Sequence, residues 1–139
     1  MSDAARLTLT TVEGEGLRFA VHTGRFMMTL DSGREAMAAS PVQAVLAALG
    51  GCSGMDVISI LRKKRQQVTG YAVELTGERA AEHPRVYTRI EILHRVTGHG
   101  VSPAAVADAI RLSDTKYCSV HAMLAASVEI VSRFEIEEA

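Results

Sequence analysis

The chain has 139 residues, of which 47% are hydrophobic and 22% charged. This composition is that of one folded domain rather than a disordered segment. Fifteen basic and sixteen acidic side chains give a net charge of -1, and there are only three Phe, three Tyr and no Trp. Because neither a broad basic surface nor an aromatic stacking platform is available, we expect no nucleic acid and no membrane as a partner.

Residues 6–30 predict short antiparallel strands. Apolar and polar side chains alternate from residue 7 to residue 11, and glycine-containing turns interrupt the pattern after it. Two further strands are expected at 17–21 and 26–30, followed by a polar loop.

A long helix is expected next. Ser40 is a good N-cap and Pro41 suits the first helical position. We expect the helix to run to about Gln67, with apolar side chains on all its sides. A helix of this kind is buried all round, so a second copy of the chain is expected to cover part of it. Gly50 and Gly54 would let another backbone come close.

The apolar stretch from residue 42 to residue 61 also has the length of a membrane span. Asp56 within that stretch would cost roughly 2.5–3.5 kcal/mol on insertion. We therefore interpret the segment as a buried helix of a soluble protein.

The remaining residues, 71–139, predict a second αβ half. Its expected elements are strands at 72–79 and 86–96, a helix at 104–112, a kink at 113–116, a short helix at about 118–126 and a strand at 128–136. With no repeat or linker, the pattern indicates a single α+β domain over 1–139. Its parts are the N-terminal strands at 6–30, the central helix at about 41–67 and this second half.

Two cysteines carry the most informative chemistry. Cys52 lies among small residues, and Cys118 stands at the expected start of a short helix, near Lys116 and His121. Helix amides and nearby cations lower a thiol pKa, so these neighbours make Cys118 the more reactive thiol. The alternative that both cysteines are small buried hydrophobic residues stays open. Two cysteines and no signal peptide indicate a reducing cytoplasm.

The sequence offers no other motif for a cofactor or metal. The five histidines form no ligand cluster, since His94 and His99 straddle a strand end and a turn. No phosphate-binding loop or Gly-x-Ser-x-Gly elbow is present. We expect no cofactor and no metal site.

Two segments of the chain stand out together. The first runs from Ser40-Pro41 through Leu46-Ala47-Ala48-Leu49-Gly50-Gly51-Cys52-Ser53-Gly54-Met55-Asp56-Val57, and the second, downstream, is Lys116-Tyr117-Cys118-Ser119-Val120. With these segments the chain resembles the OsmC/Ohr family of osmotically inducible and organic-hydroperoxide-resistance proteins. The resemblance covers nearly the whole chain. It implies an OsmC-like fold, with antiparallel sheets around a long buried central helix, in an intertwined homodimer.

The resemblance also implies a thiol-dependent peroxidase that reduces organic hydroperoxides in oxidative-stress defence. By similarity, Cys52 attacks the peroxide and becomes a sulfenic acid, and Cys118 condenses with it to a disulfide. An external dithiol, a lipoylated protein or a small thiol, would reduce the bridge. Such a bridge needs a Cα separation of roughly 4.4–6.8 Å.

The sequence departs from the peroxidase pattern in its supporting residues. In that branch a Glu follows the Pro of the central helix and an Arg lies near the N-terminal strands. Here Val42 follows Pro41, while Arg18 is the nearest candidate for the arginine and Arg25 the second. The implied catalytic residues are therefore Cys52, Cys118 and Arg18, and the Gly-Gly-Cys-Ser motif resembles a less characterised branch.

Two other functions stay open. One is a non-enzymatic OsmC-fold protein that binds a ligand or senses redox state, and the other is a disulfide-exchange factor. Rapid oxidation at Cys52 and a reducible bridge to Cys118 would distinguish the peroxidase from both.

Overall fold

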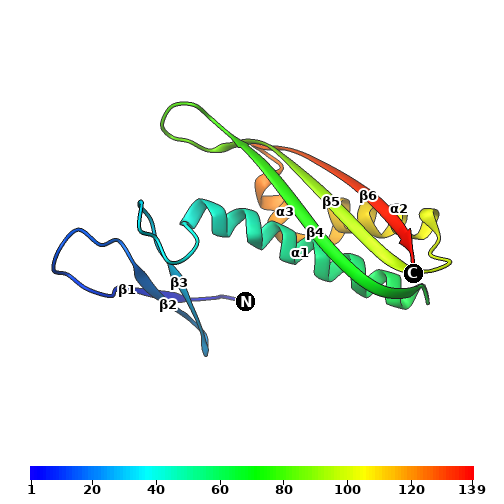
Figure 1. Cartoon of the computed structure of the whole chain (residues 1–139), viewed down its shortest axis with the longest axis horizontal. Coiled ribbons are helices and arrows are strands. Elements are labelled where there is room, and N and C mark those ends of the chain that lie inside the picture. The colour runs from blue at the N-terminus through cyan, green and yellow to red at the C-terminus, as the bar shows by residue number, and fades with distance from the viewer. The chain divides into compact units, whose positions relative to one another are not determined.

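The structure, a computed structural model, describes all residues from 1 to 139. The chain divides into two compact units, Met1–Val45 and Leu46–Ala139, and the strands and α-helices are labelled in Figure 1. Helices and strands occur together in the chain, which confirms the α+β class.

The N-terminal unit contains one three-stranded antiparallel sheet in the order β1-β2-β3. Its strands are β1 (Ala5–Leu9), β2 (Phe19–Thr23) and β3 (Phe26–Leu30). The prediction of three short antiparallel strands is confirmed, although β1 ends before Thr10, whose N–H bonds instead to the carbonyl of Arg18. Val21 is the buried hydrophobic residue of this unit, while Phe26 and Met27 are 65% and 69% exposed.

Helix α1 (Pro41–Lys63) begins where the sequence predicts. The Ser40 hydroxyl accepts a hydrogen bond from the Gln43 N–H, and the Gln43 side chain accepts one from the Ser40 N–H, which together form a capping box. The predicted end at Gln67 is wrong. Arg65 adopts a left-handed conformation with φ 56°, and the chain leaves the helix there.

The C-terminal unit contains a second three-stranded sheet in the order β4-β5-β6. Strands β4 and β5 pair antiparallel, whereas β5 and β6 pair parallel, because the chain crosses back through helices before β6. The expectation of antiparallel sheets therefore holds for β4 and β5 but not for the pairing of β5 with β6. The elements are β4 (Gln67–Arg79), β5 (Tyr87–His99), α2 (Pro103–Leu112), a π-helical turn η1 (Ser113–Tyr117), α3 (Ser119–Leu124) and β6 (Glu129–Glu138).

Helices α1 and α2 pack on this sheet around one core, in which Val57, Leu61, Val96, Val106 and Ala109 are buried. The glycines of α1 make the close packing possible. A Cβ added to Gly50 would lie 2.5 Å from Leu75 Cδ1, and one added to Gly54 would lie 3.1 Å from Val73 Cγ2. These glycines therefore admit side chains of β4, not another backbone as the sequence suggested.

Only one face of α1 is buried within the chain. Its buried residues are Leu49, Gly50, Ser53, Gly54, Val57 and Leu61. Val45 and Met55 on the other faces are 39% and 73% exposed, so a single chain does not bury the helix all round. With a mean hydropathy of 1.8, α1 also has the length and composition of a membrane span, a test that core helices of soluble proteins pass as well.

A polar pair of one buried and one partly buried side chain lies between β4 and β5. The Tyr71 hydroxyl and His94 Nδ1 are 2.6 Å apart and share a hydrogen bond, and the two rings are stacked. His94 is fully buried, and its Nε2 has no hydrogen-bond partner. Burial lowers the pKa of His94 to about 4 and raises the pKa of Tyr71, so both side chains are neutral at pH 7.

We predict that His94 makes the protein less stable in acid. The unfolded chain binds a proton on this histidine below pH 6.5, whereas the folded chain binds it only near pH 4, so lowering the pH favours unfolding. The free energy of unfolding should lose about 2.5 kcal/mol between pH 7 and pH 4.5 through this group. Urea unfolding at both pH values should show a smaller loss in His94→Gln and an unchanged loss in His99→Gln, an exposed histidine. Equal losses in all three proteins would contradict this account.

Candidate functional site

Three side chains that can react or bind meet in the C-terminal unit: Cys52, Asp56 and Cys118. Their two sulfurs and a carboxylate oxygen all lie within 4.8 Å of one another. Cys52 and Asp56 are four residues apart on α1 and so share one face of the helix. Cys118 comes from the residue between η1 and α3, 66 residues further along the chain. The fold thus brings together the two cysteines that the sequence singled out, and both are free thiols.

Cys118 is the less accessible of the two sulfurs, with 3% exposure. Its Sγ accepts a hydrogen bond from the His121 N–H at 3.3 Å. Burial, and then the interaction with Cys52, raise the pKa of the Cys118 thiol to about 12. The expectation of a low pKa for Cys118 is therefore wrong, because desolvation outweighs the single amide that faces the sulfur.

The cationic neighbours that the sequence placed near Cys118 are engaged elsewhere. Lys116 Nζ lies over the Tyr117 ring, 5.2 Å from its centroid. His121 Nε2 lies 3.8 Å from the Asp114 carboxylate. Spacing along the chain put both side chains near the sulfur, but contacts with neighbouring residues of η1 give them other partners.

Cys52 is only partly buried. Next to it, Gly51 is exposed, and a Cβ added there would meet no other atom within 4 Å. Its other neighbour, Ser53, is fully buried. Cys52 therefore stands at the edge of the buried face of α1, which makes it the more accessible thiol.

Asp56 is the residue of this cluster that no sequence motif marked. Its Oδ2 accepts a hydrogen bond of 3.0 Å from the Ser113 hydroxyl, and the same hydroxyl lies 3.5 Å from the Ser53 hydroxyl. Ser53 and Ser113 are both fully buried. The four-residue spacing from Cys52 was the only sequence feature that could have marked Asp56 as a site residue. That spacing alone does not show that Ser113 of η1 lies beside α1 and bonds to the Asp56 carboxylate.

A small cavity of about 270 Å³ extends from Asp56 along the same helix. Its walls come from α1, from the end of α2 and from η1: Asp56, Ser59, Ile60, Lys63, Leu112 and Tyr117. Asp56 belongs to both the thiol cluster and this cavity, and Tyr117 directly precedes Cys118. A small molecule in the cavity would therefore lie beside the thiol site.

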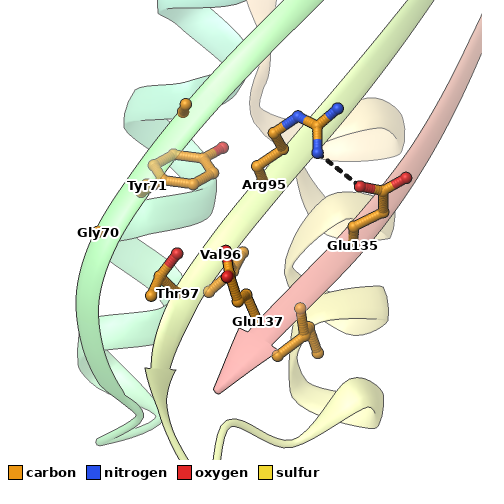
Figure 2. A pocket seen from close by; sticks show the side chains of 9 residues that line it. Gly70, Tyr71, Arg95, Val96, Thr97, Glu135 and Glu137 are labelled. Atoms are coloured by element: carbon orange, nitrogen blue, oxygen red, sulfur yellow. Dashed lines mark hydrogen bonds and ion pairs between the residues drawn. The ribbon is translucent and has the colours of Figure 1, made fainter. Parts of the chain in front are cut away.

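A larger hollow of about 400 Å³ lies on the sheet of the same unit (Figure 2). Arg95 bridges Glu74 and Glu135 there, at 2.9 Å and 2.7 Å. No cysteine lines this hollow, and Arg95 is already paired with both glutamates. It offers a binding surface at most, with no reactive group.

The candidate arginines lie in the N-terminal unit. Arg18 Nε donates to Asp31 Oδ2 at 2.9 Å. Asp31 is buried, and the Met37 N–H, the Arg18 guanidinium and the Ser32 N–H hold its pKa below the usual range. Arg25 lies over the Phe26 ring, 5.1 Å from its centroid. Within the unit Arg18 thus holds a buried carboxylate, and its part in thiol chemistry stays a prediction.

Comparison with known proteins supports the assignment suggested by these residues. Residues 33–133 match the family model described as OsmC-like protein. The chain belongs to the OsmC-like family. It is 44% identical over 123 residues to protein YhfA of Escherichia coli K12, an alignment covering 88% of this chain and 92% of YhfA.

Solved structures show the same fold. A hypothetical protein from Aquifex aeolicus superimposes with a TM-score of 0.88 at 31% identity, covering 100% of this OsmC-like chain and 98% of the other. An organic hydroperoxide resistance protein OsmC from Legionella pneumophila superimposes with a TM-score of 0.67 at 11% identity, covering 97% of both chains. The second likeness establishes a shared fold alone.

We predict that Cys52 is alkylated before Cys118 in the reduced, folded protein. The reason is access, since Cys52 is partly exposed while Cys118 is 3% exposed. Iodoacetamide followed by peptide mass spectrometry should label Cys52 at least about 10-fold faster, given that buried cysteines are inert. Addition of denaturant should make the two rates alike. Faster labelling of Cys118 in the folded protein would reverse this order.

Proposed function

We propose that this OsmC-like protein is a two-cysteine thiol peroxidase that reduces organic hydroperoxides. The observation that carries the proposal is the meeting of Cys52 and Cys118 Sγ within 4.8 Å, with Asp56 in the same cluster. A two-cysteine cycle needs one accessible sulfur and one sheltered sulfur within reach of it. The exposure of the two thiols fits that division of roles.

In the first step Cys52 is oxidised and the hydroperoxide is reduced. The Cys52 sulfur attacks the outer peroxide oxygen, the S–O bond forms and the O–O bond breaks, giving a sulfenic acid and an alcohol. The leaving alkoxide takes one proton, and the thiol gives one up. In this proposal Asp56, whose carboxylate oxygen lies within 4.8 Å of the sulfur, accepts the thiol proton through one bridging water or after a small turn of its side chain, and returns it to the leaving oxygen.

In the second step the Cys118 thiol attacks the sulfur of the Cys52 sulfenic acid. The S–S bond forms, the S–O bond breaks and water leaves with the Cys118 proton. An external dithiol, of the small or lipoyl type, then reduces the bridge and becomes a disulfide itself. Closing the S–S bond to about 2.05 Å requires the two side chains to turn toward each other.

The apolar part of the cavity beside Asp56 favours an organic hydroperoxide over hydrogen peroxide. Ile60, Leu112 and Tyr117 offer carbon surface to a small alkyl or aryl group. We also propose a cytoplasmic homodimer. Each unit separately exposes apolar side chains that a second copy would cover: Phe26 and Met27 on the N-terminal sheet, and Met55 on α1 in the C-terminal unit.

A redox-sensing or ligand-binding role without turnover is the second candidate. The burial of Cys118, which keeps its thiol neutral, favours this alternative because a neutral thiol attacks a sulfenic acid slowly. In that case the hollow around Arg95 in Figure 2, which contains no cysteine, would be the place to look for a ligand.

We predict that one equivalent of an organic hydroperoxide removes both thiols of the reduced protein. A colorimetric thiol count should fall from two per chain to none. In Cys52→Ser the Cys118 thiol should persist, whereas in Cys118→Ser the Cys52 thiol should be lost and a sulfenic acid should be trapped by dimedone. Persistence of both thiols in the parent protein at several equivalents would favour the non-enzymatic role.

We further predict that Asp56→Asn slows the first step by about 10–100-fold, because the amide cannot carry the proton to the leaving alkoxide. Stopped-flow measurement of sulfenic acid formation in the Cys118→Ser background isolates that step. Asp108→Asn, which removes a carboxylate from the ion pair with Lys64, is the matched control and should leave the rate unchanged. An unchanged rate in Asp56→Asn would remove Asp56 from the chemistry.

A further inference from the structure

We propose that Cys52, Asp56 and Cys118 bind a soft divalent cation, Zn²⁺ in the first instance, when both thiols are reduced. The proposal goes beyond the peroxidase cycle and does not depend on it. It rests on the cluster in which two sulfurs and a carboxylate oxygen lie within 4.8 Å of one another. The expectation of no metal site rested on the scattered histidines, and none of them belongs to this cluster.

The donor atoms suit zinc in kind and in spacing. Thiolate and carboxylate are both common zinc ligands, at about 2.3 Å for sulfur and about 2.0–2.2 Å for oxygen. Donors at those distances from one tetrahedral ion lie roughly 3.5–3.8 Å apart. Because the three atoms already lie within 4.8 Å, closing around an ion needs side-chain adjustments of about 1 Å and no rearrangement of the fold.

The charge of the cluster also favours a cation. The buried Cys118 thiol is neutral without a metal, but once an ion has displaced both thiol protons the three ligands carry three negative charges in a partly buried place. Asp56 forms no ion pair with any lysine, arginine or histidine of the chain, and its partner is the neutral Ser113 hydroxyl. A divalent ion would offset two of these charges, so the reduced cluster has more to gain from a metal than from any side chain near it.

Neighbouring residues orient the three donor atoms, and the site stays accessible to water. The fully buried Ser113 hydroxyl orients the Asp56 carboxylate, in the manner of the outer-shell hydrogen bonds that support metal ligands. The His121 N–H fixes the Cys118 sulfur in the same way. Cys52 and Asp56 are partly exposed, and the cavity beside Asp56 gives water access to a fourth coordination position.

Binding would exchange protons for metal without any redox change. Two thiols and Zn²⁺ become a zinc dithiolate and two released protons, with the Asp56 carboxylate as the third ligand. A disulfide uses the same two sulfurs, so the metal-bound state and the oxidised state exclude each other. Zinc would therefore protect the reduced thiols, and oxidation to the disulfide would release the ion.

Anaerobic titration of the full-length reduced protein tests the proposal. With Zn²⁺ and a competing chromophoric chelator, we expect one ion per chain. With Co²⁺ as a probe, we expect thiolate-to-metal charge-transfer absorption and the visible bands of a tetrahedral ion. Cys52→Ser and Cys118→Ser should each weaken binding at least about 100-fold, and Asp56→Asn about 10-fold, while Asp108→Asn should bind as the parent does. Circular dichroism of each variant checks that it is folded.

A stoichiometry of half an ion per chain, no charge-transfer band, or unchanged affinity in folded Cys118→Ser would each overturn the proposal. The readouts are separate from those of the peroxidase cycle, since no peroxide is present in the titration and no metal in the thiol count. Loss of thiols to peroxide with no bound metal would end this inference and leave the peroxidase standing. Tight metal binding with thiols that resist peroxide would do the reverse.

Discussion

The close packing of α1 on β4 is the constraint on which the thiol site depends. Gly50 and Gly54 have no side chains, so Leu75 and Val73 of β4 fill the space beside the helix. This contact fixes the rotation of α1 about its own axis. Once that rotation is set, Cys52 falls at the edge of the buried face, and the side chain one turn later faces Ser113. A methyl group at Gly50 would have to displace the Leu75 side chain, and one at Gly54 would press against Val73 Cγ2 at 3.1 Å.

The two thiols differ in reactivity because the fold leaves them with different solvent exposure. Cys118 is desolvated by the residues packed around it, so its neutral form is favoured and its reactivity is held back. Cys52 lies at the edge of the buried face of α1 and keeps partial access. The negative charge of Asp56 raises the pKa of Cys118 further, and a carboxylate oxygen of Asp56 lies within 4.8 Å of both sulfurs. The cluster thus combines a sheltered, neutral sulfur with a more accessible sulfur and a carboxylate.

Local chemistry made part of this structure predictable. The start of α1 follows from Ser40, Pro41 and Gln43, which form a cap from neighbouring residues. The end of α1 could not be predicted, because the left-handed turn at Arg65 is set by the need to lead into β4 and not by a glycine. The parallel pairing of β5 with β6 could likewise not be predicted from the sequence, since it depends on the path that the chain takes through the helices between these strands.

The candidate site was likewise predictable from the sequence only in part. The two cysteines stand out by their residue type and their sequence neighbours, so the sequence alone is enough to select them. The low pKa expected for Cys118 was wrong because adjacent residues reveal a helix end but not burial, which comes from the whole unit. The sequence showed Asp56 only as a charge in an apolar helix. Its partner Ser113 lies 57 residues away, a separation that no local pattern encodes.

Asp56 offers a carboxylate in place of the glutamate that follows the proline in the peroxidase branch, where this chain has Val42. Ten residues separate position 42 from Cys52, which is about 15 Å along a helix and more than a glutamate side chain can span. A carboxylate at position 42 could therefore reach such a sulfur only from a second copy of the chain. Asp56 lies on the same helix face as Cys52 and within 4.8 Å of it. In the proposed cycle, with Val42 after Pro41 and Asp56 one turn beyond Cys52, the proton acceptor therefore belongs to the same chain as the thiol, and its distance from the sulfur does not depend on how two copies meet.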